Sequence, residues 1–126
     1  MLMASKSFNC RSMLVKIPLA LIFFLSIWIQ GSDAQFEDYC IADNQASEDE
    51  LVNAMRWACS NGADCSAIQD YQNCYFPNTT KDHASYAFNS YYQNMKHSGA
   101  SCYFTAAAIL TGLDPSHDSC KFVYIP

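Results

Sequence analysis

The feature that most constrains this chain is its cysteine content. Seven of its 126 residues are Cys, many more than an ordinary cytosolic domain carries. Six follow residue 34: Cys40, Cys59, Cys65, Cys74, Cys102 and Cys120. An even number of cysteines in a small secreted chain is typical of a disulfide framework, here three bridges out of 15 pairings. Zinc is the alternative, but the sequence has no Cys-x-x-Cys pair, so we expect neither a metal nor another cofactor.

Residues 1–34 have the order of a secretory signal peptide. Basic residues come first, and an uncharged apolar run over residues 17–29 follows. The small residues Ser32 and Ala34 suit the −3 and −1 positions of a cleavage site. A membrane anchor is the alternative, but a bilayer span needs about 20 apolar residues and this run is shorter. We therefore predict an extracellular protein whose mature domain is residues 35–126.

The predicted mature domain is small and acidic. It holds four Lys or Arg against eleven Asp or Glu, which argues against a nucleic-acid partner because basic side chains neutralise phosphates. A domain of this size buries only about 60–70% of its unfolded surface, so disulfides worth roughly 2–4 kcal/mol each would be its main support. No hydrophobic tail follows Cys120 to signal a GPI anchor, so we expect no membrane partner after cleavage.

Capping residues and apolar periodicity predict two helices. A Ser-x-x-Glu capping box at Ser47 and an Asn-Gly pair at Asn61 delimit a first helix over about 48–60. A second helix should start at Thr79 or the next residue and end at about Met95.

The rest of the domain is expected to be loops and short strands. Residues 65–68 suggest a short helical turn, and residues 70–78 a loop. Residues 101–110 and 121–124 have strand character, with a turn around Asp114 between them. The predicted fold class is therefore a small, disulfide-linked α+β domain.

Several segments of the chain resemble the plant X8 domain, also classed as carbohydrate-binding module family 43. They are Tyr39-Cys40-Ile41-Ala42, Arg56-Trp57-Ala58-Cys59, residues 62–69, 74–79 and 83–93, and Asp114-Pro115-Ser116. The resemblance implies a fold of two helices against a small antiparallel sheet. It also implies the pairing Cys40–Cys102, Cys59–Cys65 and Cys74–Cys120.

The chain departs from that family pattern at three places. Tyr39 stands where the family usually has Trp, and the usually Gly-rich segment after the fifth cysteine is Phe104-Thr105-Ala106-Ala107-Ala108. Asp118 replaces a Gly that commonly sits two residues before the last cysteine. We expect these changes to affect the shape of the sheet region.

The resemblance implies binding of β-1,3-glucans such as callose and laminarin. Flat aromatic rings with amides beside them suit such a ligand, because sugars have apolar C–H faces and hydroxyl edges. The candidate carbohydrate-binding residues are Tyr75, Tyr86, Phe88, Asn89, Tyr91, Tyr92 and Gln93. On a helix the last six cannot all face inward, so one subset should be core and another exposed. Pure packing is the alternative for the whole segment.

Other notable residues have simpler explanations. Trp57 is expected in the core and His83 in a capping or packing role. Asn78-Thr79-Thr80 is an N-glycosylation sequon. Catalysis is not expected, because no carboxylate pair stands out and the chain is too short for a (β/α)₈ barrel of about 250 residues.

The function predicted is therefore that of a secreted, non-catalytic β-1,3-glucan-binding module of the plant cell wall. A glucanase or another cell-wall protein is a candidate partner. The alternative is a cysteine-rich interaction or signalling protein that has lost glucan binding, as the missing glycines and Tyr39 would allow.

Overall fold

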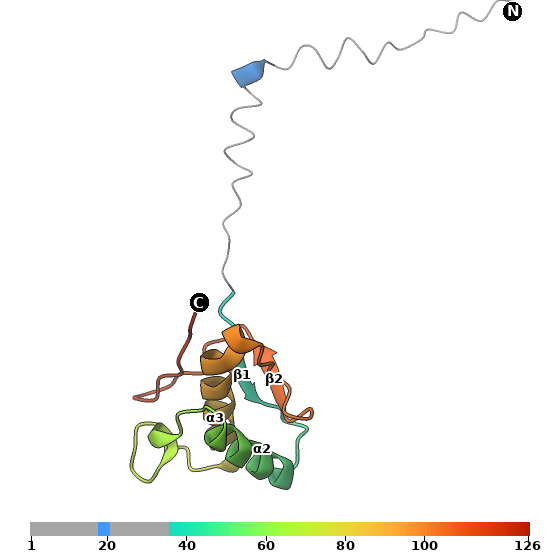
Figure 1. The fold of residues 1–126 in the computed structure, drawn as a ribbon. Helices are drawn as coiled ribbons and strands as arrows, with labels where there is room; N and C mark the ends of the chain where they lie inside the picture. The colour runs from blue at the N-terminus through green and yellow to red at the C-terminus, as the bar shows by residue number, and fades with distance from the viewer. Residues whose placement is uncertain (1–17, 21–35) are drawn as a thin grey trace, which may run out of the picture. The chain divides into compact units, whose positions relative to one another are not determined.

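The computed structural model of the protein describes residues 18–20 and 36–126 (Figure 1). The predicted signal peptide and its cleavage site lie outside the described residues, apart from residues 18–20. Residues 36–126 form one compact unit. Within the described ranges, the helices are too short or too polar to span a bilayer.

The compact unit contains two α-helices and a two-stranded sheet (Figure 1). Its elements, in chain order, are β1 Tyr39–Ala42, α2 Glu48–Ser60, the 3₁₀ turn η2 Ser66–Ile68, α3 Thr80–Met95, the 3₁₀ turn η3 Lys96–Ser98 and β2 Ala108–Thr111. Strands β1 and β2 pair antiparallel, with Tyr39 opposite Thr111 and Ala42 opposite Ala108. The predicted α+β class, both helices and the short turn at 65–68 are confirmed.

Both main helices begin at the caps that the sequence predicted. The Ser47 side chain accepts a hydrogen bond from the backbone N–H of Glu50, and the Glu50 carboxylate accepts one from the Ser47 N–H. Thr79 caps α3 by accepting from the N–H of Asp82. After α2, Gly62 adopts a φ of 128°, where a Cβ would lie only 3.1 Å from the Met95 sulfur. This conformation favours glycine, and a larger residue would also require the Met95 side chain to shift.

The strand predictions were only partly right. β2 covers just the end of the predicted strand at 101–110, and β1 was not predicted. Residues 121–124 are not a strand, because side chains rather than a neighbouring strand satisfy this segment. The N–H of Phe122 donates to the Ser116 hydroxyl, and the carbonyl of Val123 accepts from the Asn89 amide.

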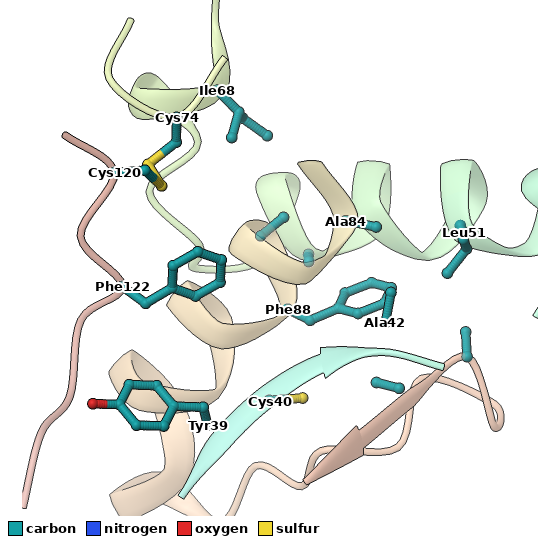
Figure 2. Packing of buried hydrophobic residues seen from close by; sticks show 14 residues of the cluster. Tyr39, Cys40, Ala42, Leu51, Ile68, Cys74, Ala84, Phe88, Cys120 and Phe122 are labelled. Atoms are coloured by element: carbon teal, nitrogen blue, oxygen red, sulfur yellow. A yellow bond between two sulfur atoms is a disulfide. The ribbon is translucent and has the colours of Figure 1, made fainter. Parts of the chain in front are cut away.

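The core gathers between α2, α3 and β1 (Figure 2). Phe88 of α3 is its largest fully buried side chain, and Ala84 and Ala87 on the same helix are also fully buried. Leu51 of α2 and Ala42 of β1 belong to the same cluster. Small alanines allow the helices to approach closely, so α3 becomes the central element on which α2 and the sheet pack.

Three disulfides tie the periphery to this core. The bonded pairs are Cys40–Cys102, Cys59–Cys65 and Cys74–Cys120. The first links β1 to the segment before β2, the second closes the end of α2, and the third joins the loop at 70–78 to the C-terminal segment. The pairing that the resemblance implied is confirmed.

Candidate functional site

The structure separates the seven candidate binding residues. Phe88, Asn89 and Gln93 are buried, with at most 1% of their surface exposed. Tyr75 and the three other tyrosines of the set, on α3, are each partly exposed. Phe88, Asn89 and Gln93 therefore have no surface with which to contact a ligand, and we remove them from the candidate site.

The two buried amides hold the fold together instead. Asn89 accepts a hydrogen bond from the Cys40 N–H at 3.2 Å and donates to the Val123 carbonyl at 2.8 Å. Gln93 donates to the Asp38 carbonyl at 2.6 Å and accepts from the Ile125 N–H at 3.0 Å. Together they join α3 to β1 and to the C-terminal segment, so their role in this structure is to satisfy backbone groups that lack a helix or sheet partner.

An open groove of about 670 Å³ lies beside α2 and the segment before β2. We call it the aromatic groove. Its aromatic lining consists of Trp57, Tyr91, Tyr103 and Phe104. Its polar lining consists of Glu50, Asn53, Ser101 and Thr105. Only Tyr91 among the seven candidates lines it, so the sequence located one member of this site.

The rings of the aromatic groove support one another. Phe104 stacks on buried Phe88 with ring centroids 4.3 Å apart. Trp57 and Tyr91 meet edge to face at 5.1 Å, and each also contacts Phe104 edge to face. Such pairs are worth about 0.5–1.5 kcal/mol beyond their buried area. The groove wall is thus a preorganised aromatic surface anchored in the core.

Trp57 is the main residue that sequence analysis misplaced. It was expected in the core, yet 49% of its surface is exposed. The buried face of α2 is set by Leu51 and Ala58, and Trp57 lies one residue, or 100° of helix rotation, from Ala58. This offset of Trp57 from the buried face of α2 is visible in the sequence and could have indicated its partial exposure. The indole packs against the rings of Tyr91 and Phe104, while about half of the residue's surface is open to solvent.

The turn that delivers Phe104 is strained. Phe104, Thr105 and Ala106 have φ values of 49°, 55° and 65°. Left-handed backbone is unfavourable for residues with a Cβ, and for a β-branched residue such as Thr it is an outlier. These three residues occupy the segment where the resemblance leads one to expect glycine. Strain of this kind persists where the surroundings fix it and often marks a functional site.

The polar groups of the aromatic groove suit hydroxyl groups better than hydrolysis. The Asn53 amide and the Ser101 and Thr105 hydroxyls can both donate and accept hydrogen bonds. Among the described residues that line the groove, Glu50 is the only carboxylate. One of its oxygens already accepts from the Ser47 N–H. Most glycosidases use two carboxyl groups about 5–9.5 Å apart, and the described lining of the groove contains one.

The other candidate tyrosines lie outside the aromatic groove. Tyr86 packs edge to face on Phe122, and burial raises its pKa. Burial also raises the pKa of Tyr92, whose ring faces the Lys96 ammonium at 5.6 Å. Tyr75 sits in the loop at 70–78, where its carbonyl lies 2.6 Å from the His83 ring nitrogen. His83 thus packs against Tyr75, in line with the packing role expected of it, whereas the cap of α3 is Thr79.

Comparison with known proteins identifies the compact unit. The family model described as "X8 domain" matches residues 38–109. Glucan endo-1,3-beta-glucosidase 4 of Arabidopsis thaliana is 49% identical over 85 residues, which cover 67% of this chain and 17% of that protein. Plasmodesmata callose-binding proteins 4 and 5 of the same plant are 42% and 36% identical. Those alignments cover 82% and 88% of this chain, and 44% and 62% of the two relatives.

Proposed function

This chain belongs to the X8 domain family, and on that premise we propose that it binds β-1,3-glucan in the aromatic groove without cleaving it. Two relatives are named for callose binding and a third for acting on 1,3-beta-glucan. The observation that carries the proposal is the groove itself, in which partly exposed Trp57 and Tyr103 stand beside hydroxyl and amide groups.

Both the aromatic and the polar residues that line the groove would take part in binding. The C–H face of a glucosyl ring would pack on Trp57, with Tyr91 and Tyr103 flanking it. Asn53 and Thr105 would exchange hydrogen bonds with hydroxyl groups at the ring edge. The volume of about 670 Å³ is within the range of about 300–1,000 Å³ usual for ligand pockets. Because the groove is open and wet, affinity for a short oligomer should be modest.

Two observations support binding without cleavage: the carboxylate content of the groove lining, and how little of the glucosidase is aligned with this chain. The groove lining offers a single carboxylate, Glu50. The alignment with the glucosidase covers only 17% of that protein. We further propose that the module acts at the plant cell wall after secretion, alone or beside a glucanase, as the predicted signal peptide over residues 1–34 suggests.

Titration with laminarin oligomers tests the proposal. We expect Trp57→Ala to weaken binding by about tenfold, since loss of one ring contact is worth on the order of 1.4 kcal/mol. Phe76→Ala is the matched control, because Phe76 is also an exposed ring, at 63%, but does not line the groove. Both variants are produced without glycosylation, and their folds are compared by circular dichroism. Equal affinities of the two variants would contradict the assignment of the groove.

A second candidate function is recognition of another protein. Ile109 and Leu110 of β2 and nearby Leu113 are exposed apolar side chains, at 44%, 51% and 79%. Exposed apolar groups of this kind can serve as a contact surface. If curdlan fails to retain the oxidised protein while a defined protein partner binds and Leu110→Ser abolishes that binding, this second candidate replaces the first.

A further inference from the structure

We propose that Asn78 carries an N-linked glycan whose first sugar packs against the exposed ring of Phe76 and the partly exposed ring of Tyr75. The acceptor sequence Asn78-Thr79-Thr80 runs from the last residue of the loop at 70–78, through the cap Thr79, to the first residue of α3, and Asn78 is exposed. This site is distinct from the aromatic groove, because none of these residues lines that groove. The proposal therefore stands independently of glucan binding.

The side chain of Asn78 is directed at an aromatic ring. Its Nδ2 atom, to which the sugar would be joined, donates a hydrogen bond to the Tyr75 hydroxyl at 3.0 Å. A sugar bonded to that nitrogen would therefore begin within contact of the Tyr75 ring. Phe76 adds a second surface, since its ring meets that of Tyr75 edge to face at 4.9 Å and is 63% exposed.

The structure holds this pair of rings in place and leaves Phe76 exposed and Tyr75 partly exposed. His83 of α3 lies under Tyr75, with ring centroids 5.5 Å apart and a 2.6 Å contact from its Nε2 to the Tyr75 carbonyl. The ring centroid of Tyr71, a residue that is 88% exposed, lies 6.1 Å from that of Tyr75. Neighbouring exposed rings of this kind often mark a contact site. The covalently attached sugar is the occupant that the neighbouring sequon supplies.

The modification itself is a group transfer. The donor is a lipid-linked oligosaccharide diphosphate of the secretory pathway. A bond forms between the Asn78 Nδ2 and C1 of the first N-acetylglucosamine, and the bond between C1 and the diphosphate oxygen breaks. The amide gives up one proton, and the lipid diphosphate is the leaving group. The remaining amide N–H can still donate to the Tyr75 hydroxyl, so the contact seen here is compatible with the modified side chain.

The first experiment measures the mass of the full chain made in plant cells. We expect the mass of one N-glycan on the wild type and on Thr80→Ser, which keeps the acceptor sequence. Asn78→Gln and Thr80→Ala should lack it. An unmodified wild-type chain would overturn the proposal, whether it is found in the medium or in the cells.

The second experiment asks whether the first sugar covers the rings. The high-mannose form is divided into three samples: intact, trimmed by an endoglycosidase to a single N-acetylglucosamine, and fully deglycosylated. We expect the first two to melt at the same temperature and the third about 4 °C lower, the shift that a modest packing gain gives a domain of this size. In Phe76→Ala the difference should shrink to under half. An equal difference in both proteins would overturn the packing contact.

Discussion

At the scale of single residues, two departures from the family pattern, in the segment after Cys102 and at Asp118, fall where the backbone is left-handed. Ala106 has a φ of 65° and Asp118 a φ of 48°, and both lie in segments where the resemblance leads one to expect glycine. An L-residue in this region costs roughly 1–2 kcal/mol, although Asp tolerates it better than Ala. These turns therefore have left-handed backbone without glycine, and their residues are locally strained.

This strain predicts that one substitution is stabilising. Ala106→Gly should raise the free energy of unfolding by about 0.5–1 kcal/mol, because the relief of strain exceeds the entropy that glycine adds to the unfolded chain. Ala100→Gly is the matched control, since Ala100 is a coil residue of the same connection without a positive φ. It should be neutral or destabilising. Urea denaturation of both variants measures the effect, and equal changes would show that strain is not its cause.

Tyr39 carries a second prediction at this scale. Burial, together with a 2.9 Å hydrogen bond to Glu37, raises the pKa of Tyr39 to about 12 from a usual 10. The folded state thus favours the neutral phenol. Its contribution to stability is complete below pH 10 and is lost as the pH rises from 10 towards 12. The urea midpoint should fall across this window, and fall less in Tyr39→Phe. A decline of the same size in both proteins would contradict this assignment.

At the scale of elements, different faces of α3 have different roles. Phe88, Asn89 and Gln93 face the core, whereas Tyr91 reaches the aromatic groove. Helical periodicity predicted that some of these α3 residues would be buried and others exposed, but it could not say which. Amides normally suggest an exposed face, and here two of them are buried because they satisfy backbone groups of β1 and of the C-terminal segment.

The buried amides give a prediction for α3. Asn89→Ala should lower the free energy of unfolding by about 2–4 kcal/mol, because it leaves the Cys40 N–H and the Val123 carbonyl without partners. Asn94→Ala is the control on the same helix, since Asn94 is exposed and makes one bond, to the Gly62 carbonyl. Its cost should be under about 1 kcal/mol. Equal costs in urea denaturation would mean that Asn89 is not a structural link.

At the scale of the whole molecule, the disulfides differ in the length of chain that they close. The sequence separations are 62 residues for Cys40–Cys102, 46 for Cys74–Cys120 and 6 for Cys59–Cys65. Restriction of the unfolded chain grows with loop length, so the two long-range bridges should dominate the stability of this small core.

This difference predicts an order of stability among disulfide deletions. Replacing Cys59 and Cys65 together by Ala should cost about 2 kcal/mol, and replacing Cys74 and Cys120 about 4 kcal/mol. The first variant should remain folded at 25 °C and the second should be largely unfolded at 37 °C. Thermal unfolding followed by circular dichroism measures both. A lower melting temperature for the Cys59 and Cys65 variant would contradict the ordering.

The sequence by itself determined where the two main helices begin and end. The caps at Ser47 and Thr79 and the Asn-Gly pair at Asn61 placed both helices, because capping and helix termination act within a few residues. The cysteine count established a disulfide framework. The pairing was implied by the family resemblance, since the residues alone left 15 arrangements open.

Tertiary structure decided everything that depends on residues far apart in the chain. Trp57 is only half buried, because its cover comes from distant residues such as Phe104, 47 positions later, which packs against its ring. Segment 121–124 is not a strand because Asn89 and Ser116 already satisfy part of its backbone. Strand propensity and helix periodicity describe one element at a time, whereas burial is a property of how elements meet. The aromatic groove exists only where α2, α3 and the strained turn at Phe104 come together, so its members could not be grouped from the sequence.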